Sequence, residues 1–334
     1  MKKILLTLFG IVFMTMSLFA QGMGVATLCH NDSISAYYGR GAFVDACKAA
    51  AAGDVITLSA GFFNASGYTI NKSITVRGAG CALDSVLHSY PTILTGSSDL
   101  KISANVVNFE GVYVENKVNL QTYGAVQFVK CRLSNVYCYS SYTPAITFIN
   151  SMIRSFTPNG SSSYIYNSIL GYFSDSNHYA DLECHNCFIK DYTDMKNSMF
   201  TNCIFEADPK SSTDSTLVTL SSTNIAYSCL GVGAKGDIFE YVKRINNMSN
   251  QSIADFSVFK SYKGGMFKDD TNFELTPEAQ KKYLGVDGKQ VGIYGGDIPY
   301  DLVPTNPQIV KFNVDSKTTP DGMLNVDIQV GSAK

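Results

Sequence analysis

The sequence contains no tryptophan and few charged residues. Of its 334 residues, 16% are Asp, Glu, Lys or Arg, and the formal net charge at pH 7 is -2. A balance this close to neutral predicts no attraction to nucleic acid or to an acidic membrane surface. Without tryptophan, the strongest platform for a sugar ring is missing, so an aromatic binding surface has to use the 20 tyrosines and 20 phenylalanines.

Only one long apolar run is present, and it lies at the start of the chain. Lys2 and Lys3 precede an apolar stretch, residues 4–19, that ends in Ala20, which is the layout of a secretory signal peptide. The stretch is shorter than the roughly 20 residues of a spanning helix, and no second one follows. We therefore expect residues 1–20 to be a signal peptide, and the mature chain to be secreted, periplasmic or on the cell surface, with no transmembrane segment.

The chain contains nine cysteines, an odd number, although it is expected to be exported. They cannot all pair with one another within the chain, and a disulfide framework is normally a device of much smaller domains. Several of them are expected to be buried thiols.

A short unit, a small residue followed by two or three apolar residues, recurs along the middle of the chain. Its small residues are Gly111, Cys131, Ser151, Ser168, Cys187, Ser198, Cys203 and Cys229. The first four intervals are 20, 20, 17 and 19 residues. Segments of this period, each too short to bury its own apolar face, predict a solenoid. The shorter steps around Ser198 indicate a change of register or of face.

The solenoid has to be made of strands, because the repeats show no helical periodicity and are rich in Val, Ile, Tyr and Phe. In a parallel β-helix, the recurring small residues stack inside the coil. This interpretation also covers Cys184, His185 and Cys187, which form a C-x-x-C with a histidine inside it. On a regular strand, Cys184 and Cys187 point to opposite faces, so we expect no metal site there.

A helix is predicted before the first coil, with Phe43, Ala46, Cys47 and Ala50 on one face and Gly53 at its end. The following residues are similar to the opening of the pectin lyase-like superfamily, in which a G-D-x-I-x-L strand precedes a K-S-I-T-V-x-G-x-G strand. The matching residues are Gly53, Asp54, Ile56, Leu58, Gly61, Phe63, Lys72, Ser73, Ile74, Thr75, Val76, Gly78 and Gly80.

The other end of the chain carries a second resemblance. An F-x-L segment followed by a G-x-D-G-x-x-V-G-x-Y-G-G turn resembles the closing segment of secreted bacterial β-helix proteins, with matches at Asp287, Gly288, Gly292, Tyr294, Gly295 and Gly296. Two alternating stretches, 308–316 and 324–331, then predict a β-hairpin. The expected organisation is a lead-in at 21–40, a β-helix at 41–303 and a hairpin segment at 304–334.

Together these resemblances imply an all-β fold, a right-handed parallel β-helix with an N-terminal capping helix and a C-terminal hairpin. The superfamily includes lyases, hydrolases and non-catalytic binding proteins on one scaffold, so the fold leaves the activity open. A lyase acting on acidic polysaccharide would need a base and bound calcium, and a hydrolase two carboxylates. We expect no cofactor otherwise, and no metal.

No paired-aspartate signature of the hydrolases and no basic lyase motif is present in the sequence. Two carboxylate pairs recur at about one coil, and a histidine lies in a polar turn between them. The weak catalytic candidates are therefore Asp175, His178, Asp181, Asp191 and Asp194.

Tyrosines gather over about two and a half coils, in a region rich in Ser and Asn. They are Tyr137, Tyr139, Tyr142, Tyr164, Tyr166, Tyr172 and Tyr179. Such rings can hold the apolar faces of sugars, or can form an ordinary ladder between coils. We predict non-catalytic binding of a polysaccharide or cell-surface glycan along this face, with a divergent lyase or hydrolase as the alternative. The oligomeric state stays open.

Overall fold

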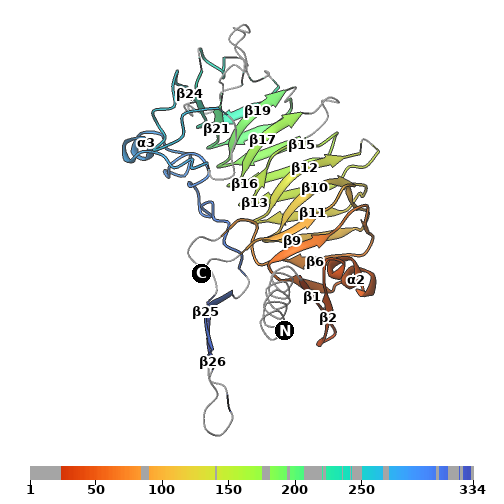
Figure 1. Cartoon of the computed structure of the whole chain (residues 1–334). Helices are drawn as coiled ribbons and strands as arrows, with labels where there is room; N and C mark the ends of the chain where they lie inside the picture. Colours follow the sequence, from red (N-terminus) through yellow and green to blue (C-terminus); the bar gives the residue numbers. More distant parts are fainter. Residues whose placement is uncertain are drawn as a thin grey trace, which may run out of the picture.

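The chain forms a parallel β-solenoid of about eight turns, shown in Figure 1. The computed structural model describes residues 24–83, 90–139, 141–174, 181–193, 196–206, 220, 223–234, 236–240, 242, 250–265, 271–305, 308–314, 323 and 326–331. The coils stack from the N-terminal end upward in Figure 1, and the C-terminal part returns along one side. The predicted parallel β-helix is confirmed.

Sheet A contains eleven strands, one from each coil and two from the lead-in. Their order is β2 (Ser33–Tyr38), β1 (Val25–His30), β3 (Val55–Leu58), β6 (Ile74–Arg77), β9 (Val106–Glu110), β11 (Ala125–Val129), β13 (Ala145–Ile149), β16 (Ser162–Tyr166), β18 (Asp181–His185), β20 (Met199–Thr201) and β22 (Ile225–Tyr227). From β3 onward the pairing is parallel, whereas β1 and β2 form an antiparallel hairpin on β3.

Sheet B contains thirteen strands and forms the opposite wall. Its main path is β4 (Gly61–Asn64), β7 (Thr92–Thr95), β10 (Tyr113–Leu120), β12 (Arg132–Cys138), β14 (Met152–Ile153), β17 (Ile169–Ser174), β19 (Phe188–Thr193), β21 (Ile204–Glu206), β23 (Leu230–Val232) and β24 (Gln251–Ser252). The short strands β5 (Thr69–Ile70), β8 (Leu100–Ile102) and β15 (Phe156–Thr157) pair beside this path.

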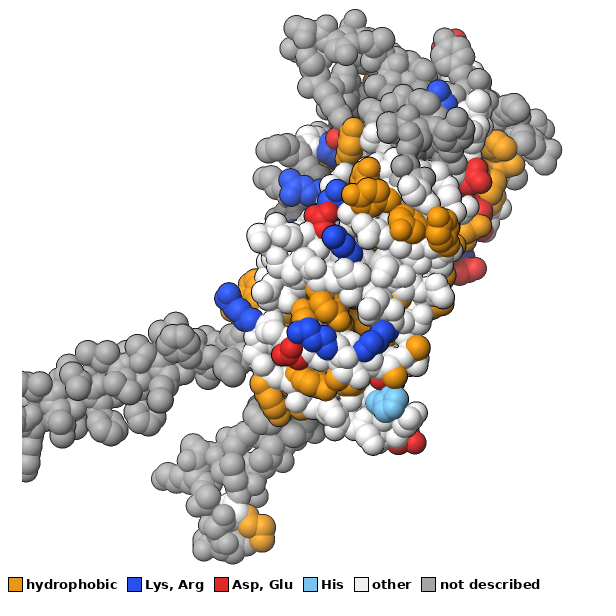
Figure 2. Space-filling model, turned by 90° about the vertical axis from the view of Figure 1, so that its right-hand side faces the viewer, with side chains coloured by type: hydrophobic (Ala, Val, Ile, Leu, Met, Phe, Trp, Pro, Cys, Tyr) orange, Lys and Arg blue, Asp and Glu red, His pale blue; other side chains and the backbone are white. Residues whose placement is uncertain are grey.

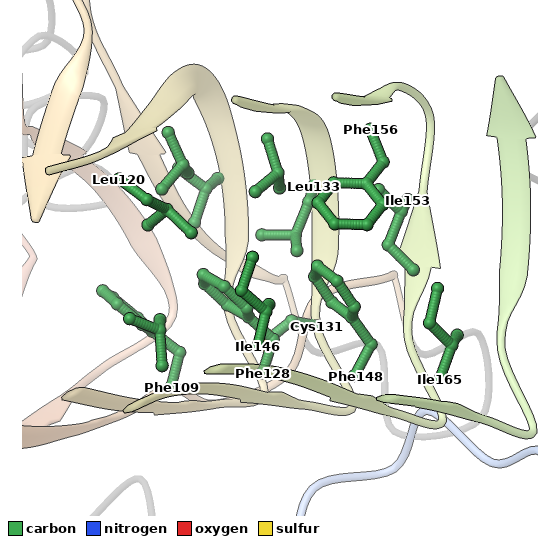
Figure 3. Packing of buried hydrophobic residues seen from close by; sticks show 14 of the residues in the cluster. Phe109, Leu120, Phe128, Cys131, Leu133, Ile146, Phe148, Ile153, Phe156 and Ile165 are labelled. Carbon is green, nitrogen blue, oxygen red and sulfur yellow. The ribbon is translucent and has the colours of Figure 1, made fainter. Parts of the chain in front are cut away.

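The interior is a ladder of apolar side chains that alternate along each strand. Phe109, Phe128 and Phe148 occupy equivalent positions of β9, β11 and β13, and their rings stack with centroids 5.3 Å and 5.5 Å apart (Figure 3). Phe156 of β15 meets Phe148 edge to face across the coil at 5.2 Å. Burying each ring contributes about 1.5–3 kcal/mol, so this ladder is the main source of stability.

From β9 onward, one corner of each successive coil is made by a residue in the left-handed conformation. These residues have φ between 45° and 64°: Gly111, Lys130, Asn150, Asn167, Asn186, Asn202 and Ser228. Asparagine tolerates this conformation better than most residues, because its short polar side chain can bond locally. The reversal turns the following side chain into the interior of the coil.

The following residue is the small, buried one that recurs in the sequence. The stack consists of Val112, Cys131, Ser151, Ser168, Cys187, Cys203 and Cys229. Successive members are vertical neighbours: the amides that follow Ser151 and Ser168 donate to the carbonyls of Cys131 and Ser151 at 2.8 Å and 2.9 Å. Two expected positions are corrected. Gly111 forms the left-handed corner itself, and Ser198 lies at another corner, before β20, where Ile225 donates to its carbonyl.

Hydrogen bonding explains why the stack contains serine and cysteine. Ser168 Oγ accepts from the amide of Ser151 at 2.9 Å and donates to the Tyr166 carbonyl at 2.7 Å. Cys203 Sγ accepts from the amide of Cys187 at 3.5 Å in the same way. Both side chains offer one donor and one acceptor in a small volume, so they are interchangeable at this position.

The N-terminal end of the core is closed by α2 (Ala42–Ala49), as the sequence predicts. Phe43, Ala46, Cys47 and Ala50 are buried against the first coils. Lys72 donates its ammonium to the carbonyls of Lys48 at 2.7 Å and Ala50 at 2.5 Å. A cation on these orphan carbonyls stabilises the helix C-terminus, which gives the lysine of the opening motif a physical role.

Part of the outer face of sheet B, around β19 and β21, is covered by a segment that we call the cover, the described part of residues 253–283. It buries Phe188 and Ile204 together with Phe259, Tyr262 and Phe273, and Phe188 and Phe273 lie 4.0 Å apart between centroids. The cover includes α3 (Pro277–Lys282). The expected F-x-L strand is reduced to one bridge, between Phe259 and Leu275. The described residues between 234 and 262 contain no helix.

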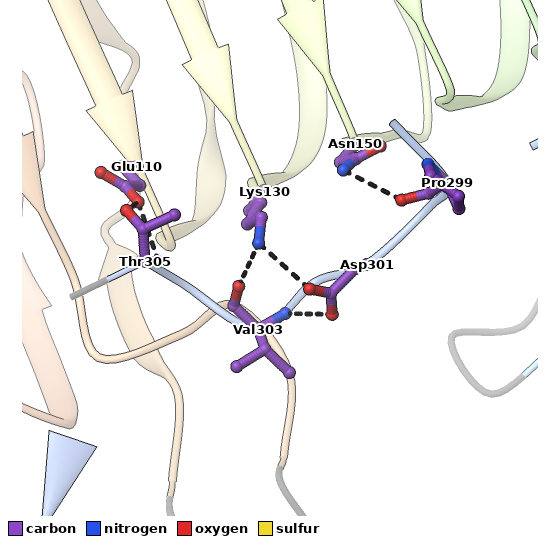
Figure 4. A network of polar contacts seen from close by, with 7 residues as sticks. All are labelled: Glu110, Lys130, Asn150, Pro299, Asp301, Val303 and Thr305. Carbon is purple, nitrogen blue, oxygen red and sulfur yellow. Dashed lines mark hydrogen bonds and ion pairs between the residues drawn. The ribbon is translucent and has the colours of Figure 1, made fainter. Parts of the chain in front are cut away.

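Residues 284–305, which we call the strap, run back down the left-handed corners (Figures 1 and 4). Asn167 Nδ2 donates to the carbonyls of Ile293 and Gly295 at 3.0 Å and 2.7 Å. Lys130 Nζ donates to the Val303 carbonyl at 2.6 Å, and Glu110 accepts from the amide of Thr305 at 3.0 Å. Each contact comes from a different coil, so the strap ties successive turns together.

Glycine at position 296 of the strap is required by space and by conformation. Its φ is 72°, and a Cβ there would lie 2.3 Å from Nδ2 of Asn186. The second glycine of the Y-G-G sequence in the closing motif is therefore needed because the strap lies close to a corner asparagine.

Beyond the strap, β25 (Gln308–Val314) and β26 (Val326–Gly331) form the predicted antiparallel hairpin. Neither helix in the described residues has the length and apolar character needed to cross a membrane. The predicted signal peptide lies outside the described residues.

Removing the Asn167 side chain is expected to loosen the strap. Asn167→Gly loses two hydrogen bonds at a corner that glycine can adopt, for a cost of about 1–3 kcal/mol in the free energy of unfolding. Asn167→Ala adds about 1–2 kcal/mol, because alanine disfavours the left-handed conformation. Urea denaturation midpoints should fall in the order wild type, Gly variant, Ala variant; equal midpoints for all three would show that the strap bonds do not stabilise the coil.

Candidate functional site

A hollow of about 380 Å³ lies on the outer face of sheet A, over its last coils. We call it the sheet A hollow. It is lined by Tyr164, Asp181, Leu182, Glu183, Asn197, Ser198, Met199, Thr223 and Ile225. Concave surfaces of this size with mixed apolar and polar lining are typical ligand sites.

The solenoid register positions these side chains. Tyr164 of β16, Glu183 of β18 and Met199 of β20 are directly paired, so they form one row along the coil axis. Within β18, Leu182 and Cys184 point into the core, which places Asp181, Glu183 and His185 outside. The row gives the hollow a tyrosine ring, a carboxylate and a thioether at successive strands about 4.8 Å apart.

A second outer row runs beside the first. His185 Nε2 lies 2.7 Å from Glu183 Oε1, and the His185 ring stacks on Tyr166 at 5.2 Å with an interplanar angle of 10°. The side chains of Glu183 and His185 are 33% and 28% exposed, so the pair is open to solvent. This arrangement orients Glu183 at the edge of the hollow.

Of the two catalytic candidates that lie among the described residues, one is at this hollow. Asp181 lines it, whereas Asp191 belongs to β19 in sheet B, on the opposite wall of the solenoid. Asp175, His178 and Asp194 lie outside the described residues. Glu183 and His185 were not among the candidates, although the alternation in D-L-E-C-H could have placed Asp181, Glu183 and His185 on one outer face.

The predicted tyrosine face is divided between two sheets, which corrects the expectation of a single surface. Tyr164 and Tyr166 lie on the outer face of sheet A, because they belong to β16. Tyr137 and Tyr172 belong to β12 and β17 of sheet B, and Tyr139 follows β12. Tyr142 lies in the next turn, where its ring is 5.1 Å from that of Tyr123. Tyr179 lies outside the described residues. A ligand-binding role for any of these tyrosines stays a prediction.

The described part of one flank of the molecule carries few charged side chains (Figure 2). Figure 2 shows one flank of the molecule, on which uncharged polar groups separate scattered hydrophobic, basic and acidic side chains in the described part. This agrees with the low charged fraction of the sequence.

Cys184 and Cys187 differ from their expected placement. Asn186 has φ 52°, so the chain turns between them and both thiols point into the core instead of to opposite faces. Cys187 Sγ donates to the carbonyls of His185 and Ile165, both at 3.2 Å, and His185 itself faces outward. Across the described residues, no group of three or more His, Cys, Asp or Glu side chains is arranged to hold a metal ion.

Thiol reactivity tests this placement. All nine cysteines are free, only Cys29 is exposed, and burial raises the pKa of the Cys131 thiol to about 12. Because the thiolate is the reactive form, we expect one thiol per native chain to react rapidly with a disulfide reagent and nine to react in denaturant. Rapid reaction of Cys187 or Cys203 in the native chain would contradict the buried stack.

A second cluster of ionisable groups lies between sheet B and the cover. Glu206, whose side chain is 2% exposed, is 3.1 Å from Lys190 Nζ, and the Tyr262 hydroxyl donates to its other oxygen at 2.5 Å. Burial raises the pKa of the Glu206 carboxyl, with a further contribution from Asp191, while Tyr262 and Lys190 oppose the shift. Since the cover buries it, we interpret this cluster as an attachment point of the cover.

The raised pKa of Glu206 makes the stability of this attachment depend on pH. The folded state holds the proton more tightly than the unfolded chain, in which the pKa is about 4.3. The stabilisation of the folded state by the protonated Glu206 carboxyl is therefore complete below that value. It is lost as pH rises through the pKa of Glu206 in the folded state. We expect wild type to lose stability relative to Glu206→Gln as pH rises above about 4.3, the value in the unfolded chain. Thermal midpoints of both proteins at matched pH measure this, and a constant difference would contradict it.

Comparisons with protein-family models, curated proteins and solved structures find no match to this chain.

Proposed function

We propose that this chain is an exported, non-catalytic protein that binds a glycan in the sheet A hollow. The observation that carries the proposal is the row in which the Tyr164 ring, 39% exposed, lies next to Glu183 over a hollow of about 380 Å³. A tyrosine ring suits the apolar face of a sugar. Asp181, Glu183 and Asn197 supply acceptors and donors for its hydroxyl groups.

We also infer that the chain is a divergent member of the pectin lyase-like superfamily. The solenoid supports this, and so do the structural roles of its motif residues, since Lys72 caps α2 and Gly296 lets the strap approach the corners. Export rests on the signal peptide predicted from residues 1–20. The proposed location is the periplasm, the cell surface or the medium.

Hydrolysis of a glycan is the second candidate, because Asp181 and Glu183 line the same hollow. Two carboxylates are the minimum that glycoside hydrolysis requires. Binding is favoured over hydrolysis because Asp181 is exposed and Glu183 is one-third exposed. A general acid that stays protonated at neutral pH usually needs drier surroundings.

Binding to a glycan array, followed by calorimetry on the best oligosaccharide, tests the proposal. Tyr164→Ala should weaken binding at least about tenfold, which corresponds to about 1.4 kcal/mol. Tyr139→Ala is the matched control, because Tyr139 is 44% exposed but does not line the hollow. It should leave the affinity unchanged.

The same oligosaccharides are incubated with the protein and assayed for new reducing ends and for unsaturated products. We expect neither. Product release that is lost in Asp181→Asn would establish hydrolysis in place of binding, and equal effects of the two tyrosine substitutions would remove the sheet A hollow as the site.

A further inference from the structure

We propose that the ligand of the sheet A hollow is a glycan bearing protonated amino groups, and not a uronate polymer. This inference rests on the proposed function and specifies its ligand. Its basis is the charge of the lining. Asp181 and Glu183 both belong to the hollow, whereas none of its described lining residues is Lys, Arg or His.

The two carboxylates come from one strand and face the same way. Asp181 and Glu183 are separated by Leu182, which is buried, so alternation along β18 places both outside. Their Cα atoms are about 7 Å apart on an extended strand. A ligand lying across the hollow therefore meets negative charge at two points, one at the start of β18 and one beside Tyr164.

The nearby basic groups can offset this charge only at Glu183, and not at Asp181. His185 contacts one oxygen of Glu183 at 2.7 Å, and it is an ion-pair partner only when protonated. Lys196 precedes the lining residue Asn197 but does not itself line the hollow. Its backbone carbonyl accepts from Ser198 Oγ at 3.0 Å.

An ammonium group fits this lining in two ways. It can donate charge-assisted hydrogen bonds to either carboxylate, and these are stronger than bonds between neutral groups. It can also lie over the Tyr164 ring, which attracts cations through its electron-rich face. A uronate would instead bring its own carboxylate toward Asp181 and Glu183, and juxtaposed like charges disfavour a wrong partner.

The probes are three hexasaccharides of equal length: a glucosamine oligomer with free amines, its N-acetylated counterpart and a galacturonate oligomer. At pH 6 and low salt, we expect the amine-bearing oligomer to bind at least about tenfold more tightly than the N-acetylated one, and the galacturonate oligomer not to bind. The preference should shrink as salt is raised, because these charges are in contact with solvent.

Substitutions in the hollow test whether the preference for the amine-bearing oligomer depends on its two carboxylates. Asp181→Asn and Glu183→Gln should each bring the affinity for the free amine closer to that for the N-acetylated oligomer, and the double variant should abolish the difference. Asp45→Asn is the control, since this carboxylate is 57% exposed on α2 at the other end of the solenoid. It should leave the preference intact.

Each result separates the two proposals. Equal, Tyr164-dependent binding of the amine-bearing and N-acetylated oligomers would overturn the charge inference while supporting glycan binding. Tighter binding of the galacturonate oligomer would overturn the inference as well. A preference for the free amine that survives the double substitution would place its source elsewhere on the surface, and would overturn the charge inference. Failure of every glycan on the array and of all three hexasaccharides would overturn both proposals.

Discussion

Each coil of this solenoid has to reverse its backbone at one corner and still close its interior. The left-handed residue makes the reversal, and the next residue has to be small, because its side chain enters a narrow space between two stacked backbones. Serine and cysteine meet this need, since each accepts from one backbone amide and donates to a carbonyl. The phenylalanine ladder, the row of outer side chains and the path of the strap all depend on this corner keeping its register.

The corner residues also bind the strap on the outside of the coil. A left-handed asparagine points its amide away from the core, where it would otherwise bond only to water. Here Asn150 and Asn167 donate to carbonyls of the strap, which therefore follows the corners for several coils. The cover protects part of the outer face of sheet B in a different way, by apolar packing and the buried Glu206–Lys190 pair. The sheet A hollow, on the outer face of sheet A, is not covered in this way. The candidate site therefore lies there.

The repeat, the α2 cap, the strand-rich coil and the terminal hairpin were predictable from local pattern, because apolar alternation and small residues at fixed intervals reflect short-range geometry. The site was less predictable. Asp181 was a candidate because it lies close to His178 in the sequence. Asp191 was a candidate because of its spacing from another carboxylate, and spacing does not tell which of two sheets a residue joins. The tyrosines were divided for the same reason: Tyr164 and Tyr172 are close in sequence, yet their strands lie on opposite walls.

The sequence by itself determined the period, the residues that turn each coil and the residues that fill it, because each of these follows from backbone conformation and side-chain size within one repeat. Only the tertiary structure decided which outer faces are covered. The cover and the strap come from residues far along the chain. They cover the later strands of sheet B and several corners, while the sheet A hollow stays open. That choice depends on contacts between distant coils, and no local pattern encodes it.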